Sequence, residues 1–107
     1  MPTPPRDPDA PPFRSADGAV VLRLAVRNHP GVLSHVSGLF ARRAFNVDGV
    51  LCLPVGDGAR SAILLLVRAD DRLEQLVRQL AKLEDVLEIR REPDGQRAFA
   101  AATAWLG

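Results

Sequence analysis

The chain has 107 residues, of which 47% are hydrophobic, and a formal net charge of +1, which is the size of one small domain. The near-neutral charge and the few aromatic residues (four Phe, one Trp and no Tyr) argue against binding to nucleic acid or to an anionic membrane, and no apolar run approaches the roughly 20 residues of a membrane span. The single cysteine, Cys52, excludes an internal disulfide and paired-cysteine motifs, and the start of the sequence has no apolar secretory segment, so we expect a soluble, cytoplasmic protein.

Residues 1–18 contain six of the nine prolines. Few residues in this segment can be buried, so the entropy lost on ordering it would not be offset. We therefore expect a disordered, proline-rich tail. A proline-rich ligand for a partner domain is the alternative interpretation of this composition.

The next segment predicts a strand followed by a helix. Residues 19–27, AVVLRLAVR, alternate apolar and polar side chains, which is typical of a half-buried strand. Apolar residues then recur at helical spacing and predict an amphipathic helix that ends near Arg43. These apolar residues are Val32, Val36, Leu39 and Phe40.

Two strands follow, joined by turn residues. Residues 45–55 are rich in β-forming residues, with Pro54 near the end, and residues 56–58 are Gly-Asp-Gly. Residues 60–68, RSAILLLVR, form a nearly continuous apolar run, which indicates a strand that is buried on both faces.

The last part of the pattern predicts a second helix and a fourth strand. Within residues 69–85 an apolar stripe has helical spacing, and Asp70 or Asp71 can cap the start of the helix. Residues 86–92 resemble a strand, and residues 93–96 a turn. The alanine-rich residues that follow fit no single element.

The predicted order is β-α-β-β-α-β. Right-handed crossovers then favour an α+β, ferredoxin-like fold: a four-stranded antiparallel sheet in the order 4-1-3-2, with two helices on one face and the other face open. We assign residues 19–93 to this domain and residues 94–107 to a C-terminal extension. That extension contains large apolar side chains, which are unfavourable when exposed to solvent, so we expect them to pack against this domain or against a partner. They are Phe99, Trp105 and Leu106.

The predicted second strand lies at an edge of the sheet. Its residues 50–55, VLCLPV, include no charged side chain, and an apolar edge promotes association unless another chain pairs with it. We therefore expect a homodimer in which second strands meet, with Val50 and Cys52 at the interface. The alternatives are a monomer whose edge is covered by the C-terminal segment, and a Cys52 that lies on the open face.

The stretch between the first strand and the first helix contains Gly31 where a helix should begin. A glycine there lets a ligand approach unpaired backbone N–H groups at the positive end of the helix dipole, which suits a carboxylate or phosphate. Asn28 can donate to an oxygen or accept from an ammonium group. The nearby Val32, Leu33 and Val47 offer an apolar wall, so the set suits a branched-chain amino acid.

A purely structural interpretation of the same residues stays open. Pro30 is of a type favoured in a first helical turn, and Gly31 of a type that marks tight turns. His29 and His35 have no identifiable nucleophile or orienting partner, and neighbours on a helix such as Ser34 and His35 do not face each other. We therefore predict no catalytic or metal site and treat His29 as a loop or ligand-contact residue.

Two longer strings carry a family resemblance. Residues 22–57, LRLAVRNHPGVLSHVSGLFARRAFNVDGVLCLPVGD, and residues 73–89, LEQLVRQLAKLEDVLEI, are similar to the small regulatory subunits of acetohydroxyacid synthase, also called acetolactate synthase. The resemblance covers about residues 20–91 and is strongest to the short, valine-sensitive type of this subunit. Most members carry a further C-terminal domain, which has no counterpart in these 107 residues.

This resemblance implies an ACT domain, in which feedback amino acids bind between the first strand–helix loop of one chain and the second strand of its partner. Asn28 to Gly31 would be the loop contribution and Asn46 that of the partner chain. The implied function is non-catalytic: the subunit activates a catalytic large subunit and makes it inhibitable by valine, with leucine and isoleucine as related effectors. No cofactor is expected in this chain, whereas the catalytic subunit is expected to use thiamine diphosphate, Mg²⁺ and FAD.

Other functions known for this topology fit less well. An RNA-recognition domain needs stacking aromatic residues on its first and third strands, and residues 20–27 and 62–68 have none. An acylphosphatase-like enzyme would need an arginine in the phosphate loop, whereas Arg27 lies on the predicted strand. The remaining alternative is a free-standing amino-acid sensor that acts on another enzyme or regulator.

Overall fold

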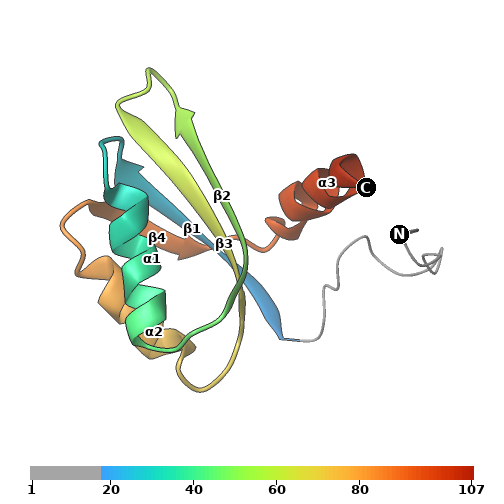
Figure 1. The fold of residues 1–107 in the computed structure, drawn as a ribbon, viewed down its shortest axis with the longest axis horizontal. Coiled ribbons are helices and arrows are strands. Elements are labelled where there is room, and N and C mark those ends of the chain that lie inside the picture. Colours follow the sequence, from blue (N-terminus) through green and yellow to red (C-terminus); the bar gives the residue numbers. More distant parts are fainter. Residues whose placement is uncertain (1–17) are drawn as a thin grey trace.

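The computed structural model describes residues 18–107. These residues form seven elements in the order β-α-β-β-α-β-α, which can be followed along the ribbon in Figure 1. They are β1 (Ala19–Arg27), α1 (Val32–Arg42), β2 (Val47–Val55), β3 (Arg60–Arg68), α2 (Leu73–Ala81), β4 (Val86–Arg91) and α3 (Gln96–Leu106). The predicted disordered tail lies outside the described residues, apart from Gly18.

The four strands form one antiparallel sheet in the order β2-β3-β1-β4, so β2 and β4 are its edges. α1 and α2 lie side by side against the same face of this sheet (Figure 1). The predicted ferredoxin-like α+β fold and its strand order are therefore confirmed. None of the helices within residues 18–107 is long and apolar enough to cross a lipid bilayer.

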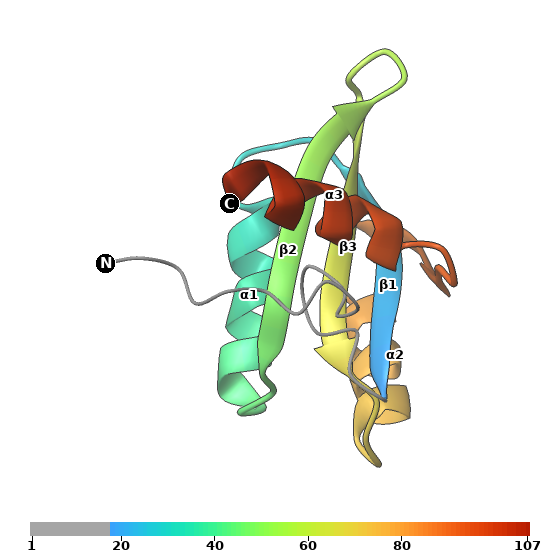
Figure 2. The ribbon, with the colours of Figure 1, turned by 90° about the vertical axis from the view of Figure 1, so that its right-hand side faces the viewer.

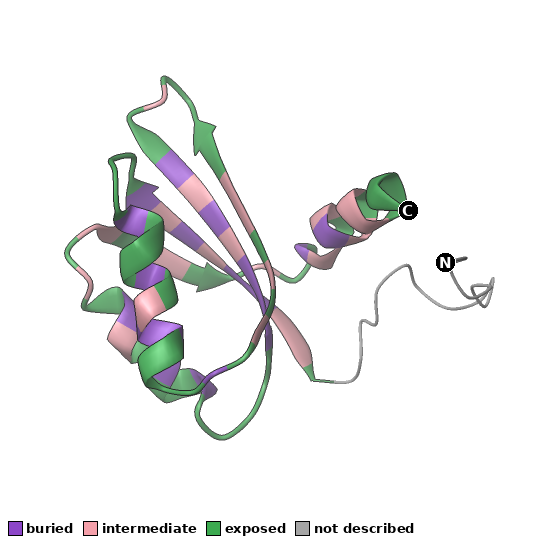
Figure 3. Cartoon of the chain, viewed as in Figure 1, coloured by how far each residue is buried: buried purple, intermediate pink, exposed green. Residues whose placement is uncertain are grey.

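The main core lies between the sheet and the helix pair. The alternation in β1 turns Leu22, Leu24 and Val26 towards the helices, where all three are fully buried. The predicted apolar stripe of α1 packs over them, and Leu73, Leu76 and Leu80 of α2 complete the layer. Figure 3 shows these buried positions on the facing sides of the helices and the sheet.

α2 begins differently from the prediction. Oδ1 of Asp70 accepts a hydrogen bond from the backbone N–H of Arg72 at 2.8 Å, one residue before the helix. Asp70 therefore closes the turn that leads into α2, and no side chain caps the helix itself.

The opposite face of the sheet is not fully open, because α3 lies across it (Figure 2). The ring of Phe99 is buried against Val21 of β1 and Leu66 of β3. This contact explains why β3 is apolar on both faces, as the sequence predicted. The end of α3 stays outside, with Trp105 87% exposed and Leu106 79% exposed. The C-terminal segment thus docks on its own domain through Phe99, but not through its last turn.

Two glycines make this close docking possible. A Cβ on Gly49 of β2 would lie 2.8 Å from the Phe99 ring, and a Cβ on Gly95 would lie 2.5 Å from Val21. Both distances are shorter than side chains allow, so the two positions must lack a Cβ for α3 to sit where it does. Gly49 also follows a register shift between β2 and β3.

Candidate functional site

The loop between β1 and α1 ends in Gly31, which has a φ of +89°. Residues with a side chain rarely adopt this left-handed conformation, whereas glycine does so readily. The backbone itself therefore requires glycine, which supports the turn interpretation. A Cβ built here would meet no atom within 4 Å, so the position also faces open space.

The first turn of α1 has the electrostatics of an anion site. No side chain caps the helix, and its first turn contains no acidic residue. The first N–H groups of a helix have no intrahelical acceptors, and the helix dipole is positive at this end. A carboxylate can therefore approach these donors next to the bare backbone of Gly31.

Asn28 ties this loop to the turn between β2 and β3. Its Nδ2 donates to the carbonyl oxygen of Gly58 at 2.7 Å, and its backbone N–H donates to the carbonyl oxygen of Ala59 at 3.1 Å. One side-chain donor of Asn28 is thus engaged within the chain. The side-chain oxygen of Asn28 is an acceptor, so the exposed amide suits an ammonium group better than it suits an oxygen of a ligand.

A hollow of about 180 Å³ lies between α1 and β2 and runs along α1 from its first turn. Leu33 from the first turn of α1 lines it, together with Val47 and Val50 of β2. Leu33 and Val47, two residues of the predicted apolar wall, both line this hollow together with Val50, and their role towards a ligand stays a prediction. The predicted wall is wrong for Val32, which is buried in the core because it belongs to the sheet-facing stripe of α1.

Asn46 lies at the other end of α1. The helix between Gly31 and Asn46 has 11 residues, which corresponds to roughly 16 Å. Nδ2 of Asn46 donates to Oδ1 of Asp48 at 3.1 Å, in the turn into β2. One small ligand cannot contact Asn28 and Asn46 of the same chain across that distance. A site with both residues needs a second copy of the chain.

Val50 and Cys52 lie on β2 and both face the helix-covered side of the sheet. Cys52 is half-buried and packs against the main core, so the alternative that placed it on the open face is wrong. Leu51 and Leu53 alternate with them and face the other side, and Leu53 is exposed. The outer edge of β2 has no neighbouring strand in the sheet of residues 18–107. The dimer contact at this edge stays a prediction.

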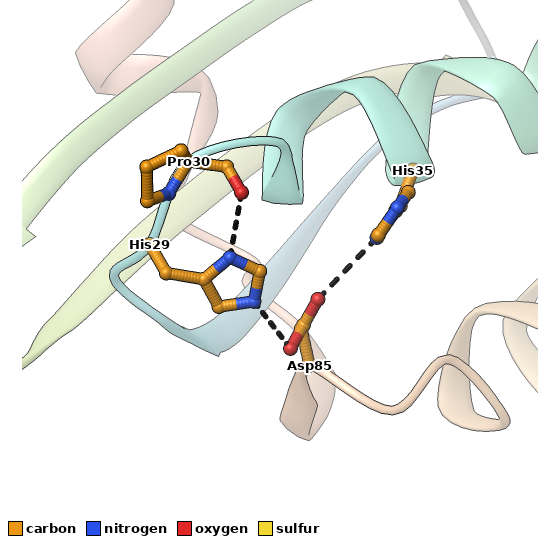
Figure 4. Close-up of polar contacts among 4 residues, drawn as sticks. All are labelled: His29, Pro30, His35 and Asp85. Atoms are coloured by element: carbon orange, nitrogen blue, oxygen red, sulfur yellow. Dashed lines mark hydrogen bonds and ion pairs between the residues drawn. The ribbon is translucent and has the colours of Figure 1, made fainter.

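One polar cluster at the loop was not predicted from the sequence. Nε2 of His29 lies 2.6 Å from Oδ1 of Asp85, and Nδ1 of His35 lies 3.4 Å from Oδ2 of the same carboxylate (Figure 4). Asp85 stands between α2 and β4, and its side chain is only 13% exposed. Nothing in the sequence marks this acidic residue, because its two partners are 50 or more positions away.

The contacts in this cluster shift the pKa values of His29 and Asp85. The hydrogen bond to Asp85, aided by one from Nδ1 to the carbonyl oxygen of Pro30 at 2.6 Å, raises the pKa of His29 above 6.5. The hydrogen bond from His29 lowers the pKa of Asp85 below 3.8. Both ring nitrogens of His29 face acceptors, so only the protonated imidazole donates to both. His29 thus holds the β1–α1 loop against the α2–β4 turn.

Comparisons with known proteins point to one family. The sequence profile described as "AHAS small subunit-like ACT domain" matches residues 22–88. The small subunit of acetolactate synthase isozyme 1 from Escherichia coli K12 is 58% identical over 80 residues, which cover 75% of this chain and 83% of that protein. The chain belongs to the acetohydroxyacid synthase small-subunit ACT family.

Other members of this family are longer. A probable acetolactate synthase small subunit from Methanothermobacter thermautotrophicus is 40% identical over 65% of this chain and 42% of its own length. The crystal structure of the small subunit from Thermotoga maritima superposes with a TM-score of 0.63 at 31% identity, over 70% of this chain and 48% of that one. The matched residues 22–88 of this ACT domain contain every candidate effector residue and Asp85, whereas α3 lies outside them.

Proposed function

We propose that this ACT domain is the regulatory small subunit of an acetohydroxyacid synthase and that it binds a branched-chain amino acid, with valine as the expected effector. One observation carries the proposal. The start of α1 at Gly31 is uncapped, and Leu33 in its first turn lines an apolar hollow together with Val47 and Val50 of β2. The first feature suits the carboxylate of an amino acid and the second its aliphatic side chain.

The complete site would form between two chains. The unprotected edge of β2 favours pairing with a second copy. Such pairing would bring Asn46 of one protomer towards the β1–α1 loop of its partner, which supplies Asn28, His29 and Gly31. The oxygen of Asn28 would then receive the ammonium group of valine, and Asn46 would contact its polar end.

Regulation would follow from a difference in affinity. Valine stabilises one geometry of the dimer over another, and that geometry engages a catalytic large subunit less productively. Coupling of about 1–3 kcal/mol changes inhibition by about 5–150-fold. In this proposal the chemistry belongs to the large subunit, which carries thiamine diphosphate, Mg²⁺ and FAD, and the present chain activates it.

Calorimetric titration of the purified chain with valine, leucine and isoleucine tests the effector site. Valinamide, which lacks the carboxylate, is the control ligand. We expect valine to bind and valinamide not to bind, because the receptor is built for a negative charge. Equal binding of both compounds would contradict the proposed carboxylate receptor.

Two variants of Gly31 separate charge from shape. Aspartate and asparagine tolerate left-handed backbone better than other residues with a side chain and have nearly the same size. We expect Gly31→Asp to abolish valine inhibition while activation of the large subunit persists, and Gly31→Asn to weaken inhibition less. If Gly31→Asp binds valine as the wild type does, the receptor lies elsewhere.

The partner is tested by reconstitution with the large subunit. The chain should co-purify with it and raise its activity, and Asn46→Ala should weaken valine inhibition without unfolding the domain. Valine binding without any association with the large subunit would favour the alternative function, a free-standing sensor of amino acids.

A further inference from the structure

The face of the sheet that carries α3 has a second, uncovered half. There a hollow of about 240 Å³ lies over β1, β3 and β4. Its floor includes Ala25 and Ala62, which are direct neighbours on β1 and β3. The side chains of Ala25 and Ala62 are small and leave this half of the face hollow. On the other half, beneath α3, larger apolar residues fill the corresponding space. Arg23, Arg60 and Arg90 line the hollow around this floor.

The arginines on this face are paired across neighbouring strands, and this pairing destabilises the folded sheet. Arg23 pairs directly with Arg90 across β1 and β4, and Arg27 pairs directly with Arg60 across β1 and β3. Like charges directly opposite each other in an antiparallel sheet are destabilising. Two such pairs on one face are unfavourable unless a negative charge lies between them.

Acidic residues of the chain neutralise this cluster only in part. Glu88 lines the hollow, and Arg90 lies 3.5 Å from a carboxylate oxygen of Glu92. Within residues 18–107, Arg23, Arg27 and Arg60 form no ion pair. The hollow therefore keeps an excess of positive charge on three neighbouring strands.

We propose that this hollow binds a compact anion that carries two or more negative charges, of the phosphate or polycarboxylate class. The guanidinium group presents a planar set of donors that matches phosphate and carboxylate oxygens. The arginines converge from three strands on one limited hollow rather than following one line, which favours a compact anion over an extended acidic polypeptide. This site is on the other face of the sheet from the effector site and does not depend on the proposed function.

Thermal unfolding of the full chain with pyrophosphate, and separately with citrate, tests the proposal. Sodium chloride at the same ionic strength is the essential control, because salt alone screens the repulsion between arginines. We expect each anion at saturation to raise the melting temperature by about 5 °C or more above the chloride control. Equal melting temperatures in the anion and in chloride would overturn the proposal.

Charge-neutral variants then locate the site. In chloride, Arg23→Gln should raise the melting temperature, because it removes the repulsion with Arg90, yet the rise caused by pyrophosphate should disappear. Arg60→Gln should weaken pyrophosphate binding about tenfold. The matched control is Arg42→Gln on α1, which removes the same charge from the other side of the sheet and should leave binding unchanged.

Two results would overturn the proposal at this stage. One is equal binding of pyrophosphate by Arg23→Gln and Arg42→Gln, which would make the effect one of net charge. The other is stabilisation by a glutamate-rich peptide but by neither small anion, which would assign the hollow to an acidic segment of a partner protein.

Discussion

The two faces of the sheet are covered in very different ways. α1 and α2 meet one face through fourteen buried residues that form a single cluster. α3 meets the other face through one buried ring, Phe99, which packs on Val21 and Leu66. The first contact depends on large side chains repeated along each element. The second depends as much on side chains that are missing, at Gly49 and Gly95.

The two layers should therefore differ in how well they tolerate substitutions. A broad cluster spreads its free energy over many contacts, so one truncation weakens the whole fold without changing its topology. A helix that docks through one buried ring and a hydrogen bond from Gln96 to the carbonyl oxygen of Ala19 can detach while the rest of the domain stays folded. Four predictions follow in decreasing order of size: three test this distinction, and one tests the contact between the β1–α1 loop and the α2–β4 turn.

Truncation in the main core should have the largest effect. Leu24 is fully buried between the sheet and the helices, so Leu24→Ala should lower the free energy of unfolding by about 2–5 kcal/mol. Urea denaturation measures this loss. Leu87→Ala is the control on β4, where Leu87 is 41% exposed, and should cost less. A comparable loss in both variants would contradict the assignment of the core.

A side chain at Gly49 should release α3 rather than unfold the domain. The new Cβ of Gly49→Ala collides with the Phe99 ring, and such overpacking typically costs about 1–3 kcal/mol. Hydrogen exchange should become faster in residues 96–106 while β1 and β3 stay protected.

The control for this variant is another glycine. Gly38 lies inside α1, where a Cβ meets only the flexible end of Arg42 at 3.3 Å. Gly38→Ala should therefore stabilise the domain by about 0.5–1 kcal/mol. A stabilising Gly49→Ala would mean that α3 does not dock as described.

The contact between His29 and Asp85 should give the domain a pH-dependent component of stability. The raised pKa of His29 means that its contribution is fully present below pH 6.5 and is lost as the pH rises through the folded-state pKa. The lowered pKa of Asp85 means that its contribution is present above pH 3.8 and is lost as the pH falls through the folded-state value. The contact is therefore strongest between these two limits.

Urea denaturation of Asp85→Asn against pH measures this component. The deficit of the variant relative to wild type should be greatest near pH 5–6 and should shrink in alkaline solution. His35→Gln should show a smaller deficit, because its contact with Asp85 is longer, at 3.4 Å. A deficit that does not change with pH would show that Asp85 acts only through packing.

The last turn of α3 should contribute least. Trp105 is almost fully exposed, so Trp105→Ala should change the free energy of unfolding by less than about 0.5 kcal/mol in dilute solution. In wild type, fluorescence of this single tryptophan should report a solvated indole. A larger loss of stability, or an emission maximum typical of a buried indole, would show that this turn has a partner.

The sequence predicted the ferredoxin-like part well, because its signals are local. Alternation in β1 and helical spacing in α1 each report which side of one element is buried, and the order of elements limits the topology to very few choices. The sequence also named Leu33 and Val47 as residues of an apolar wall, and both line the hollow between α1 and β2. Val32 was assigned wrongly because a residue in the first turn can face either the core or the ligand.

The sequence alone was enough to predict the six elements of the ferredoxin-like domain, their order, their apolar faces and the glycine at the start of α1, but not α3. The packing of Phe99 against Gly49, the contact of Asp85 with two histidines and the hollow surrounded by arginines from three strands became visible only in the three-dimensional structure. Each of these depends on which distant residues become neighbours, and no periodicity within one element contains that information. Contacts within an element are set by local geometry, whereas contacts between elements exist only once the whole sheet has assembled.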